Sequence, residues 1–177
     1  MEAPSSIEPA LMPKRIVVGV GGLAVSTNRA GRLTTFSLGS CLGITIYDPV
    51  SKVGGMVHAM LPDSSLNPAK AAQHPGMFVD SGIPALFRAA YKLGLDKGRA
   101  LICVAGGAQI MDTSGFFNIG QRNVNRLATL LEQHGLEIKA MEVGGLVSRT
   151  IQMNIATGEV RLKTSGQSAE TILMKGQ

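Results

Sequence analysis

The order of strand-like and helix-like segments constrains the fold of this chain more than any other feature of its sequence. Short β-type runs occupy both ends of the sequence, at 16–20, 33–38, 42–47, 55–61, 136–143, 149–155 and 160–163. Apolar residues at helical spacing follow Asp80 and Gln121, and a run typical of a buried strand lies between them at 100–105. This order predicts an α/β fold, a single-domain layered sandwich of mixed β-sheet with about two main helices, rather than a doubly wound parallel sheet.

Two of the β-type runs are expected to pair as a hairpin. The run 42–47 alternates with a period of two, and its apolar face carries Leu42, Ile44 and Ile46. Asp48-Pro49 opens a connection that ends at Gly54-Gly55, where the next run begins. After that run, 62–77 contains three prolines and no periodicity, which predicts a long loop of the kind that is often functional.

The two predicted helices have recognisable ends. The first is expected to begin at an N-cap, either Asp80 or Ser81, and to stop at Gly94. The second is expected to run from about Gln121 to a stop at Gly135.

Length and composition fit one domain. The chain has 177 residues, of which 45% are hydrophobic, enough for a single packed core. We expect a flexible N-terminal extension over 1–13, a domain over 14–163 and a loose C-terminal tail over 164–177. The start of the sequence lacks the basic flank and apolar run of a signal peptide, and no segment has the length and hydropathy of a membrane span. These features predict a cytoplasmic protein with no membrane insertion.

Several binding functions are disfavoured. The formal charge is +5, but Lys and Arg are scattered singly, and with no Trp and two Tyr there is little to stack bases on, so nucleic acid is not an expected partner. The glycine pairs form neither a dinucleotide-binding fingerprint nor a phosphate loop, and we expect no cofactor. Three histidines and two cysteines match no zinc spacing, so no metal site is expected.

One cysteine lies in a glycine-flanked turn, Leu38-Gly39-Ser40-Cys41, and His58 lies on the β-type run that follows. If the intervening runs pair, the thiol and the imidazole form the two halves of a cysteine nucleophile. A thiol with a pKa of about 8.5 is mostly protonated near neutral pH, so the imidazole is needed to accept its proton. Gly39 permits close approach of the backbone, and the N–H groups around Ser40 and Cys41 are candidate donors to a developing oxyanion. A third residue that orients His58 can come from three upstream hydroxyls: Thr34, Thr35 and Ser37.

Each of these residues also has a structural interpretation. A cysteine beside a strand is often a small buried hydrophobe, and we assign that role to Cys103. His58, among apolar neighbours, can be a hydrogen-bonded core histidine, whereas His74 and His134 are expected at the surface. From the residues alone, the enzymatic and the structural interpretations both stay open.

Longer motifs resemble a known family. They are Thr35-Phe36-Ser37-Leu38-Gly39-Ser40-Cys41, Tyr47-Asp48-Pro49, the run from Gly54 to Pro62, Gly106-Gly107-Ala108, the run from Ile119 to Val124, and Gly144-Gly145 followed by Arg149. In this order they resemble the chemoreceptor glutamine deamidases of the CheD family, over about residues 14 to 163.

The resemblance implies an activity and a set of roles. It implies a cytoplasmic chemotaxis enzyme that converts receptor glutamines to glutamates and releases ammonia, with a fold similar to that of bacterial deamidating toxin catalytic domains. Carried over by position, Cys41 is the nucleophile, His58 the general base and acid, and Thr35 the third member, because Thr35 has the family's spacing to Cys41 and Thr34 does not. No cofactor is implied.

The partners implied are methyl-accepting chemotaxis receptors and, for many members of the family, a CheC-type phosphatase that acts on phosphorylated CheY. Two alternatives stay open: a non-catalytic adaptor that binds receptors or the phosphatase, and hydrolysis of receptor methyl esters by the same chemistry.

The sequence departs from the family pattern in two places. Ser148 stands where a glycine is expected before Arg149, which raises a question about the local turn because a non-glycine residue resists positive φ. Phe78-Val79-Asp80 replaces a more familiar Tyr-Ala-Asp. The motifs Gly106-Gly107 and Arg122-Asn123 are interpreted as turn and cap chemistry.

Overall fold

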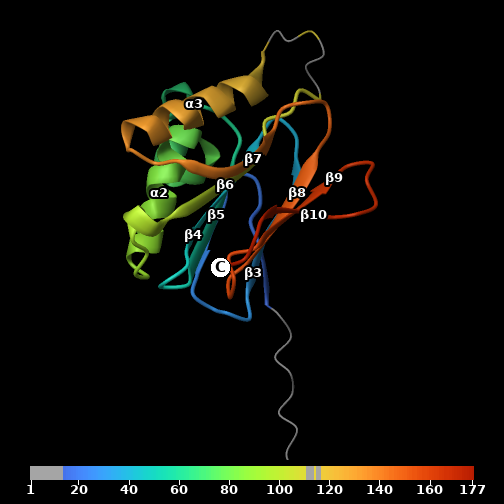
Figure 1. Cartoon of the computed structure of the whole chain (residues 1–177). Coiled ribbons are helices and arrows are strands. Elements are labelled where there is room, and N and C mark those ends of the chain that lie inside the picture. Colours follow the sequence, from blue (N-terminus) through green and yellow to red (C-terminus); the bar gives the residue numbers. More distant parts are fainter. Residues whose placement is uncertain (1–13, 111–113, 115–116) are drawn as a thin grey trace, which may run out of the picture.

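The computed structural model describes residues 14–110, 114 and 117–177. Two five-stranded sheets pack face to face, and two long helices cover the free face of one of them, which gives a helix–sheet–sheet arrangement (Figure 1). In spatial order, the central sheet contains β2 (Leu23–Ser26), β5 (Val53–Ala59), β4 (Leu42–Asp48), β6 (Leu101–Gly106) and β7 (Ile138–Val143). The outer sheet contains β1 (Arg15–Val17), β3 (Arg32–Leu38), β8 (Arg149–Asn154), β9 (Val160–Thr164) and β10 (Thr171–Met174).

Both sheets are mixed, which confirms the predicted layered α/β class. β1 pairs with β3 and β6 with β7 in parallel, and the other neighbours are antiparallel. The predicted hairpin is confirmed, since β4 and β5 pair from Leu42↔Ala59 to Asp48↔Val53. Both strands are buried along their whole length because one face meets the helices and the other meets the outer sheet.

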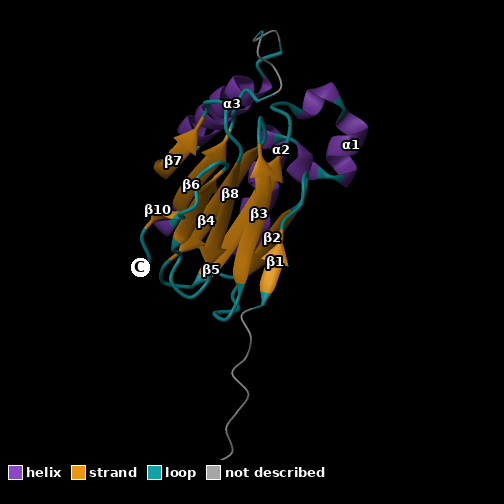
Figure 2. Cartoon of the chain, turned by 90° about the vertical axis from the view of Figure 1, so that its right-hand side faces the viewer, coloured by secondary structure: helices purple, strands orange, loops and turns teal. Residues whose placement is uncertain are grey.

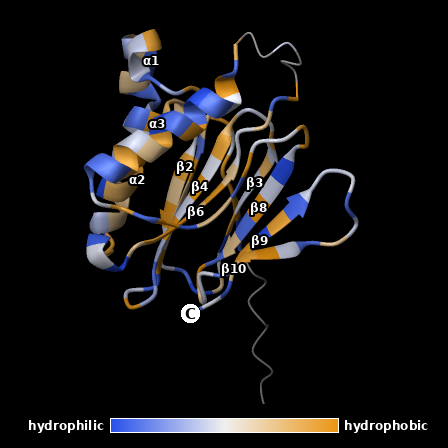
Figure 3. Cartoon of the chain, turned by 45° about the horizontal axis from the view of Figure 1, so that its top comes forward, coloured by the Kyte–Doolittle hydropathy of each residue, from blue (hydrophilic) through white to orange (hydrophobic). Residues whose placement is uncertain are grey.

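The two main helices are α2 (Val79–Tyr91) and α3 (Ile119–Gln133), close to the predicted ranges. Their apolar faces turn toward the central sheet, and their polar faces toward solvent (Figure 3). The predicted cap of the first helix is wrong: the N-cap is Phe78 without a side-chain hydrogen bond, and Asp80 instead accepts bonds from the N–H and hydroxyl of Ser64. No helix in the described ranges has the length and hydropathy needed to cross a membrane.

A short helix, α1 (Pro68–Gln73), lies within the segment predicted as a loop (Figure 2). The side chain of its N-cap, Asn67, accepts a hydrogen bond from the Lys70 N–H at 3.0 Å, and Pro68 occupies the first helical position. An asparagine followed by proline is a recognised helix start, so this signal was present in the sequence.

The C-terminal residues differ from the predicted loose tail. β10 pairs antiparallel with β9, and Met174 is buried in the layer between the sheets. A four-residue strand with one buried side chain leaves little periodic signal among the polar residues around it, which explains the missed strand. The predicted N-terminal extension, 1–13, lies outside the described residues.

The Asp48-Pro49 turn is held by a buried carboxylate. Asp48 accepts hydrogen bonds from the Arg99 guanidinium at 2.7 and 3.1 Å and from the Val50 and Asp96 N–H groups at 2.9 Å each. Burial alone would raise the pKa of the Asp48 carboxyl, but these hydrogen bonds together hold it well below its usual range. The carboxylate therefore fixes the end of the β4–β5 hairpin opposite to the cysteine.

Candidate active site

The imidazole of His58, in β5, is oriented from the outer sheet. Its Nδ1 lies 2.7 Å from the hydroxyl oxygen of Thr35, and that hydroxyl donates to the carbonyl oxygen of Val18 at 2.6 Å. The hydroxyl has a single proton, which is used in the bond to Val18, so Nδ1 must carry the proton in its bond to Thr35. The neutral ring is therefore in the tautomer that leaves a lone pair on Nε2.

The Nε2 atom of His58 is buried and has no hydrogen-bond partner within the described part of the chain. Burial lowers the pKa of the imidazole, so the ring is neutral at neutral pH. A buried acceptor without a partner costs about 1–3 kcal/mol, and a histidine kept only for packing has no reason to bear that cost. The lone pair on Nε2 is thus available as a base.

Cys41 comes directly before β4 and lies diagonally across the hairpin from His58. Gly43 pairs with His58, and side chains directly opposite on antiparallel strands share a face, as do alternate residues of one strand. Cys41, two residues before Gly43, is therefore on the same face as His58. Its half-buried side chain packs against the apolar layer between the sheets.

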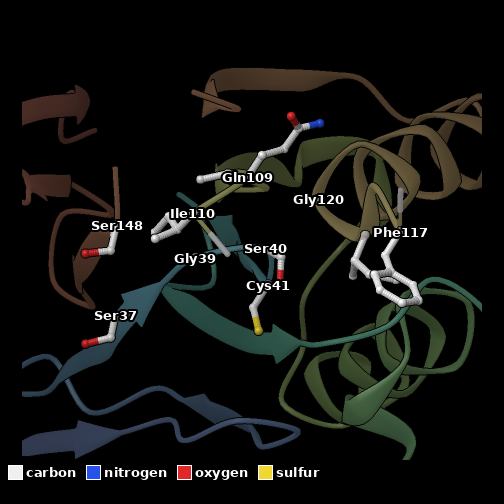
Figure 4. Close-up of a pocket in the computed structure, with 11 residues that line it drawn as sticks. Ser37, Gly39, Ser40, Cys41, Gln109, Ile110, Phe117, Gly120 and Ser148 are labelled. Carbon is white, nitrogen blue, oxygen red and sulfur yellow. The ribbon is translucent and has the colours of Figure 1, made fainter. Parts of the chain in front are cut away.

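Cys41 also lines a cleft of about 480 Å³. In Figure 4, Cys41 and Ser40 lie between Ser37 and Ser148 on one side and Phe117 and Gly120, at the start of α3, on the other. Burial raises the pKa of the Cys41 thiol, and its own backbone N–H offsets part of that rise. At neutral pH the Cys41 side chain is therefore a thiol and the His58 ring a neutral imidazole.

Hydrogen bonds from other parts of the chain fix the carbonyl groups of the loop that carries Cys41. The Ala108 N–H donates to the Gly39 carbonyl at 2.8 Å, the Gly107 N–H to the Cys41 carbonyl at 2.9 Å, and the Asn123 side-chain amide to the Ser40 carbonyl at 2.9 Å. Among the residues that the structure describes, the Ser40 and Cys41 N–H groups donate to no backbone carbonyl and to no other side chain.

Two glycines beside this loop allow close approach of neighbouring groups. A Cβ at Gly106, where φ is 113°, would collide with the Cys41 carbonyl. A Cβ at Gly43 would lie 2.7 Å from Leu38, 3.0 Å from Ile151 and 3.2 Å from the Thr35 methyl group. The missing side chain at Gly43 thus lets the outer sheet approach closely enough for Thr35 to reach His58.

A β-bulge in β3 aims two side chains at this layer. Thr35 pairs with Ile151 and Leu38 with Arg149, so two residues of β3 oppose one residue of β8. Within the bulge, Ser37 has a φ of 54°. Thr35 and Leu38, an odd number of positions apart, are both fully buried, whereas Phe36 is 44% exposed.

The structure places the five site residues that the sequence predicts in two groups, Thr35 with His58 and Gly39 and Ser40 with Cys41. Thr35 and His58 are hydrogen-bonded, Cys41 shares their sheet face, and Gly39 and Ser40 line the cleft. The competing hydroxyl of Thr34 instead accepts from Gln152. Cys103 is fully buried and His74 and His134 are exposed, in agreement with their structural interpretation.

The contacts that Asn123 makes with the cysteine loop were not predicted from the sequence. Asn123 is not a cap, since the N-cap of α3 is Asn118; it is fully buried, and its amide reaches both the Ser40 and the Met60 carbonyls. The available signal was a polar residue on the apolar stripe of the helix, one turn before Leu127.

The turn before Arg149 resolves the question raised by Ser148. Positive φ is taken by Gly144 and Gly145, at 79° and 72°, and Ser148 is not among the described non-glycine residues with positive φ. Serine is therefore compatible with this turn.

No group of three or more metal-ligating side chains lies together in the described part of the chain, so no metal-binding residues can be named there. The site combines a thiol at a cleft with a neutral base on the same face of the hairpin, the two groups that cysteine-dependent acyl transfer uses. Fold and site together define an α/β protein with a cysteine just before one strand of a hairpin and a histidine on the other strand.

Comparison with known proteins identifies the family of this chain. A family model described as CheD chemotactic sensory transduction matches residues 60–164. A Syntrophus aciditrophicus protein named "probable chemoreceptor glutamine deamidase CheD 1" is 44% identical over 85% of this chain and 94% of its own length. A Solibacter usitatus protein of the same name without the numeral is 39% identical over 90% of this chain and 94% of its own length. This chain belongs to the CheD family.

Among solved structures, a Neisseria meningitidis protein of the DUF152 family model is similar, with a TM-score of 0.37 and 11% identity, over 74% of this chain and 58% of that one.

The two thiols are expected to react at different rates. Burial raises the pKa of the Cys103 thiol to about 12, and its side chain is fully buried, whereas Cys41 is half-buried, lines a cleft and shares the sheet face of His58. Iodoacetamide at neutral pH should therefore alkylate Cys41 much faster than Cys103, as measured by peptide mass spectrometry. Equal rates at the two thiols would contradict an activated Cys41.

Proposed function

We propose that this protein is a chemoreceptor glutamine deamidase that converts receptor glutamine side chains to glutamate and releases ammonia. It is then a protein-glutamine glutaminase with Cys41 as nucleophile. The observation that carries the proposal is the bond from the Thr35 hydroxyl to Val18, which leaves His58 with a lone pair on Nε2, on the sheet face of Cys41. Membership of the CheD family, together with the names of its relatives, supports the substrate class.

The first half of the reaction forms a thioester. As the Cys41 sulfur attacks Cδ of the glutamine, its proton passes to His58 Nε2, and the amide oxygen becomes an oxyanion. The N–H groups of Ser40 and Cys41, which donate to no backbone carbonyl among the described residues, are the donors within the loop for that oxyanion. His58 then protonates the departing nitrogen, the C–N bond breaks, and ammonia leaves.

The second half returns the enzyme to its resting state. A water molecule gives a proton to Nε2 while its oxygen attacks the thioester carbon, and the same N–H groups receive the second oxyanion. Collapse breaks the C–S bond, the sulfur regains a proton from His58, and glutamate is released. Throughout, the Thr35 hydroxyl oxygen accepts the hydrogen bond from the Nδ1–H group of His58, which keeps Nε2 directed at the reacting atoms.

The partners follow from the same proposal. The substrate is the cytoplasmic part of a methyl-accepting chemotaxis receptor, so we place the enzyme in the cytoplasm, and a CheC-type phosphatase is a candidate binding partner. The charge of +5 favours approach to an acidic helical surface. It would raise the rate at which the two proteins associate and would not change the rate of the chemical step. The domain that performs this reaction is proposed to span 14–163, with β10 adding a strand beyond its end.

The proposal is tested by peptide mass spectrometry of a chemoreceptor signalling domain co-expressed with the native protein or with Cys41→Ala. We expect specific glutamines to become glutamates with the native protein and to stay unchanged with the variant. Cys103→Ala is the matched control, because it removes a thiol of the same layer without touching the cleft.

Two outcomes would change the assignment. If several receptors show no conversion while the native protein still binds them, the non-catalytic adaptor is the correct function. If glutamines stay intact but methylated glutamates lose their esters in a Cys41-dependent way, the activity is an esterase.

A further inference from the structure

Asn123 is a buried polar residue that lies directly behind the cysteine loop. Its Nδ2 donates to the Ser40 carbonyl at 2.9 Å and to the Met60 carbonyl at 3.0 Å, and the residue is fully buried. One amide group thus connects α3, the loop before β4 and the chain just after β5. No other side chain in the described ranges hydrogen-bonds to that loop.

The Ser40 carbonyl belongs to the same peptide unit as the Cys41 N–H. In a planar trans peptide the C=O and N–H bonds point in opposite directions, so fixing one fixes the other. Asn123 holds the carbonyl toward the interior and thereby directs the Cys41 N–H away from it, toward the cleft side of the loop. A hydrogen bond to the carbonyl also polarises the peptide unit and strengthens its N–H as a donor.

The preceding peptide unit is arranged in the same way. The Gly39 carbonyl accepts from the backbone N–H of Ala108 at 2.8 Å, which fixes the direction of the Ser40 N–H. The direction of each candidate oxyanion donor is therefore fixed by a hydrogen bond to the carbonyl group of the same peptide unit. One of these bonds comes from the backbone, and the other comes from the side chain of Asn123, which substitution can change.

The cost of keeping Asn123 in this position is visible in the structure. Its Oδ1 atom is buried and has no partner among the described residues. An unsatisfied buried carbonyl of this kind costs about 1–3 kcal/mol, which leucine at the same place on the apolar stripe would avoid. The residue is thus better explained by its two donated bonds than by packing.

We infer that Asn123 is a positioning residue for the reaction, which aims the Cys41 N–H at the oxyanion. The inference rests on the proposed function for its chemistry. It separates two properties of the site: the nucleophilicity of Cys41, which depends on His58, and the stabilisation of the oxyanion, which depends on the peptide that Asn123 holds.

The test compares Asn123→Ala with the native protein on a purified chemoreceptor signalling domain. We expect kcat to fall by about 10- to 100-fold with KM unchanged, less than the roughly 10²- to 10³-fold cost of deleting an oxyanion donor outright. The rate of Cys41 alkylation by iodoacetamide should stay within about twofold, because alkylation forms no oxyanion. Asn125→Ala, at an exposed position of the same helix, is the matched control and should change none of these values.

A second measurement does not require turnover. Butanal carries the carbon chain of a glutamine side chain with an aldehyde in place of the amide, and the Cys41 sulfur can add to it while the thiol proton passes to the aldehyde oxygen. Protection of Cys41 from iodoacetamide reports this adduct, and Asn123→Ala should need a severalfold higher butanal concentration. If the native protein does not deamidate receptors but butanal protects it at a severalfold lower concentration than it protects Asn123→Ala, the proposed function fails, while the role of Asn123 in aiming the Cys41 N–H stands.

The inference is overturned if Asn123→Ala matches Asn125→Ala in kcat and in butanal protection. It is also overturned if kcat, alkylation rate and melting temperature fall together, because Asn123 would then act only on the stability of the loop. Should the alanine variant not fold, Asn123→Leu keeps about the size of the side chain, suits the apolar stripe of α3 and offers no donor, so the same expectations apply to it.

Discussion

Replacing His58 with alanine is expected to lower the rate of receptor deamidation by about 10³-fold, within the range for loss of a general acid and base. The variant leaves the Cys41 thiol, whose pKa burial raises, without a proton acceptor, so alkylation by iodoacetamide at neutral pH should slow as well. Ammonia release and the alkylation rate are the two measurements. His134→Ala, at an exposed position near the end of α3, is the control.

The pH dependence gives this prediction a sharper form. Burial lowers the pKa of His58, so the neutral base persists below the usual histidine value of about 6.5. The native rate should therefore stay level down to about that pH and decline only in more acidic solution, as the ring is protonated. His58→Ala should lack this acid limb. A native rate that already falls between pH 8 and 7 would contradict a depressed pKa at His58.

Replacing Gly43 with alanine is expected to lower kcat by about 10- to 100-fold, since displacing a catalytic group by about 1 Å can cost about 10²-fold. The added Cβ would lie 3.2 Å from the Thr35 methyl group, so Thr35 has to shift, while the nearer ends of the Leu38 and Ile151 side chains can rotate aside. A shift of Thr35 weakens its bond to His58 and leaves the imidazole freer to rotate and to change tautomer. The measurement is kcat together with thermal stability.

Gly55→Ala is a matched control for overpacking. Its Cβ would meet Leu86 at 2.9 Å, Ile46 at 3.1 Å and Val25 at 3.2 Å, on the helix side of the same sheet. Both variants should lose about 1–3 kcal/mol of stability, since both force extra volume into a packed core. Only Gly43→Ala should lose most of its activity at a temperature where both are folded; similar losses in both variants would show that Gly43 has no specific role at the site.

The sequence was sufficient to predict the parts of the fold that repeat a pattern. The alternation of Leu42, Ile44 and Ile46 and the turn at Asp48-Pro49 predict the β4–β5 hairpin, and this hairpin alone places Cys41 near His58. The choice of Thr35 over Thr34 came from the family resemblance, because the alternation of a strand does not say which face meets a second sheet.

Other parts depend on contacts between distant segments, which a local pattern does not contain. β10 is a strand only because β9 offers a free edge, and Asn123 reaches the cysteine loop only because α3 packs behind it. The bond from Thr35 to Val18, which sets the tautomer of His58, joins residues of two segments that lie side by side only in the folded sheet.

The bulge in β3 also determines which changes in chain length this site can tolerate. Thr35 and Leu38 both face inward only because the extra residue shifts the side-chain alternation between them. Removing one residue there would turn either the partner of His58 or an anchor of the cysteine loop toward solvent, even though every remaining amino acid were kept. We therefore expect relatives that share this site to vary in the length of their surface loops but to keep the residue count from the threonine to the cysteine.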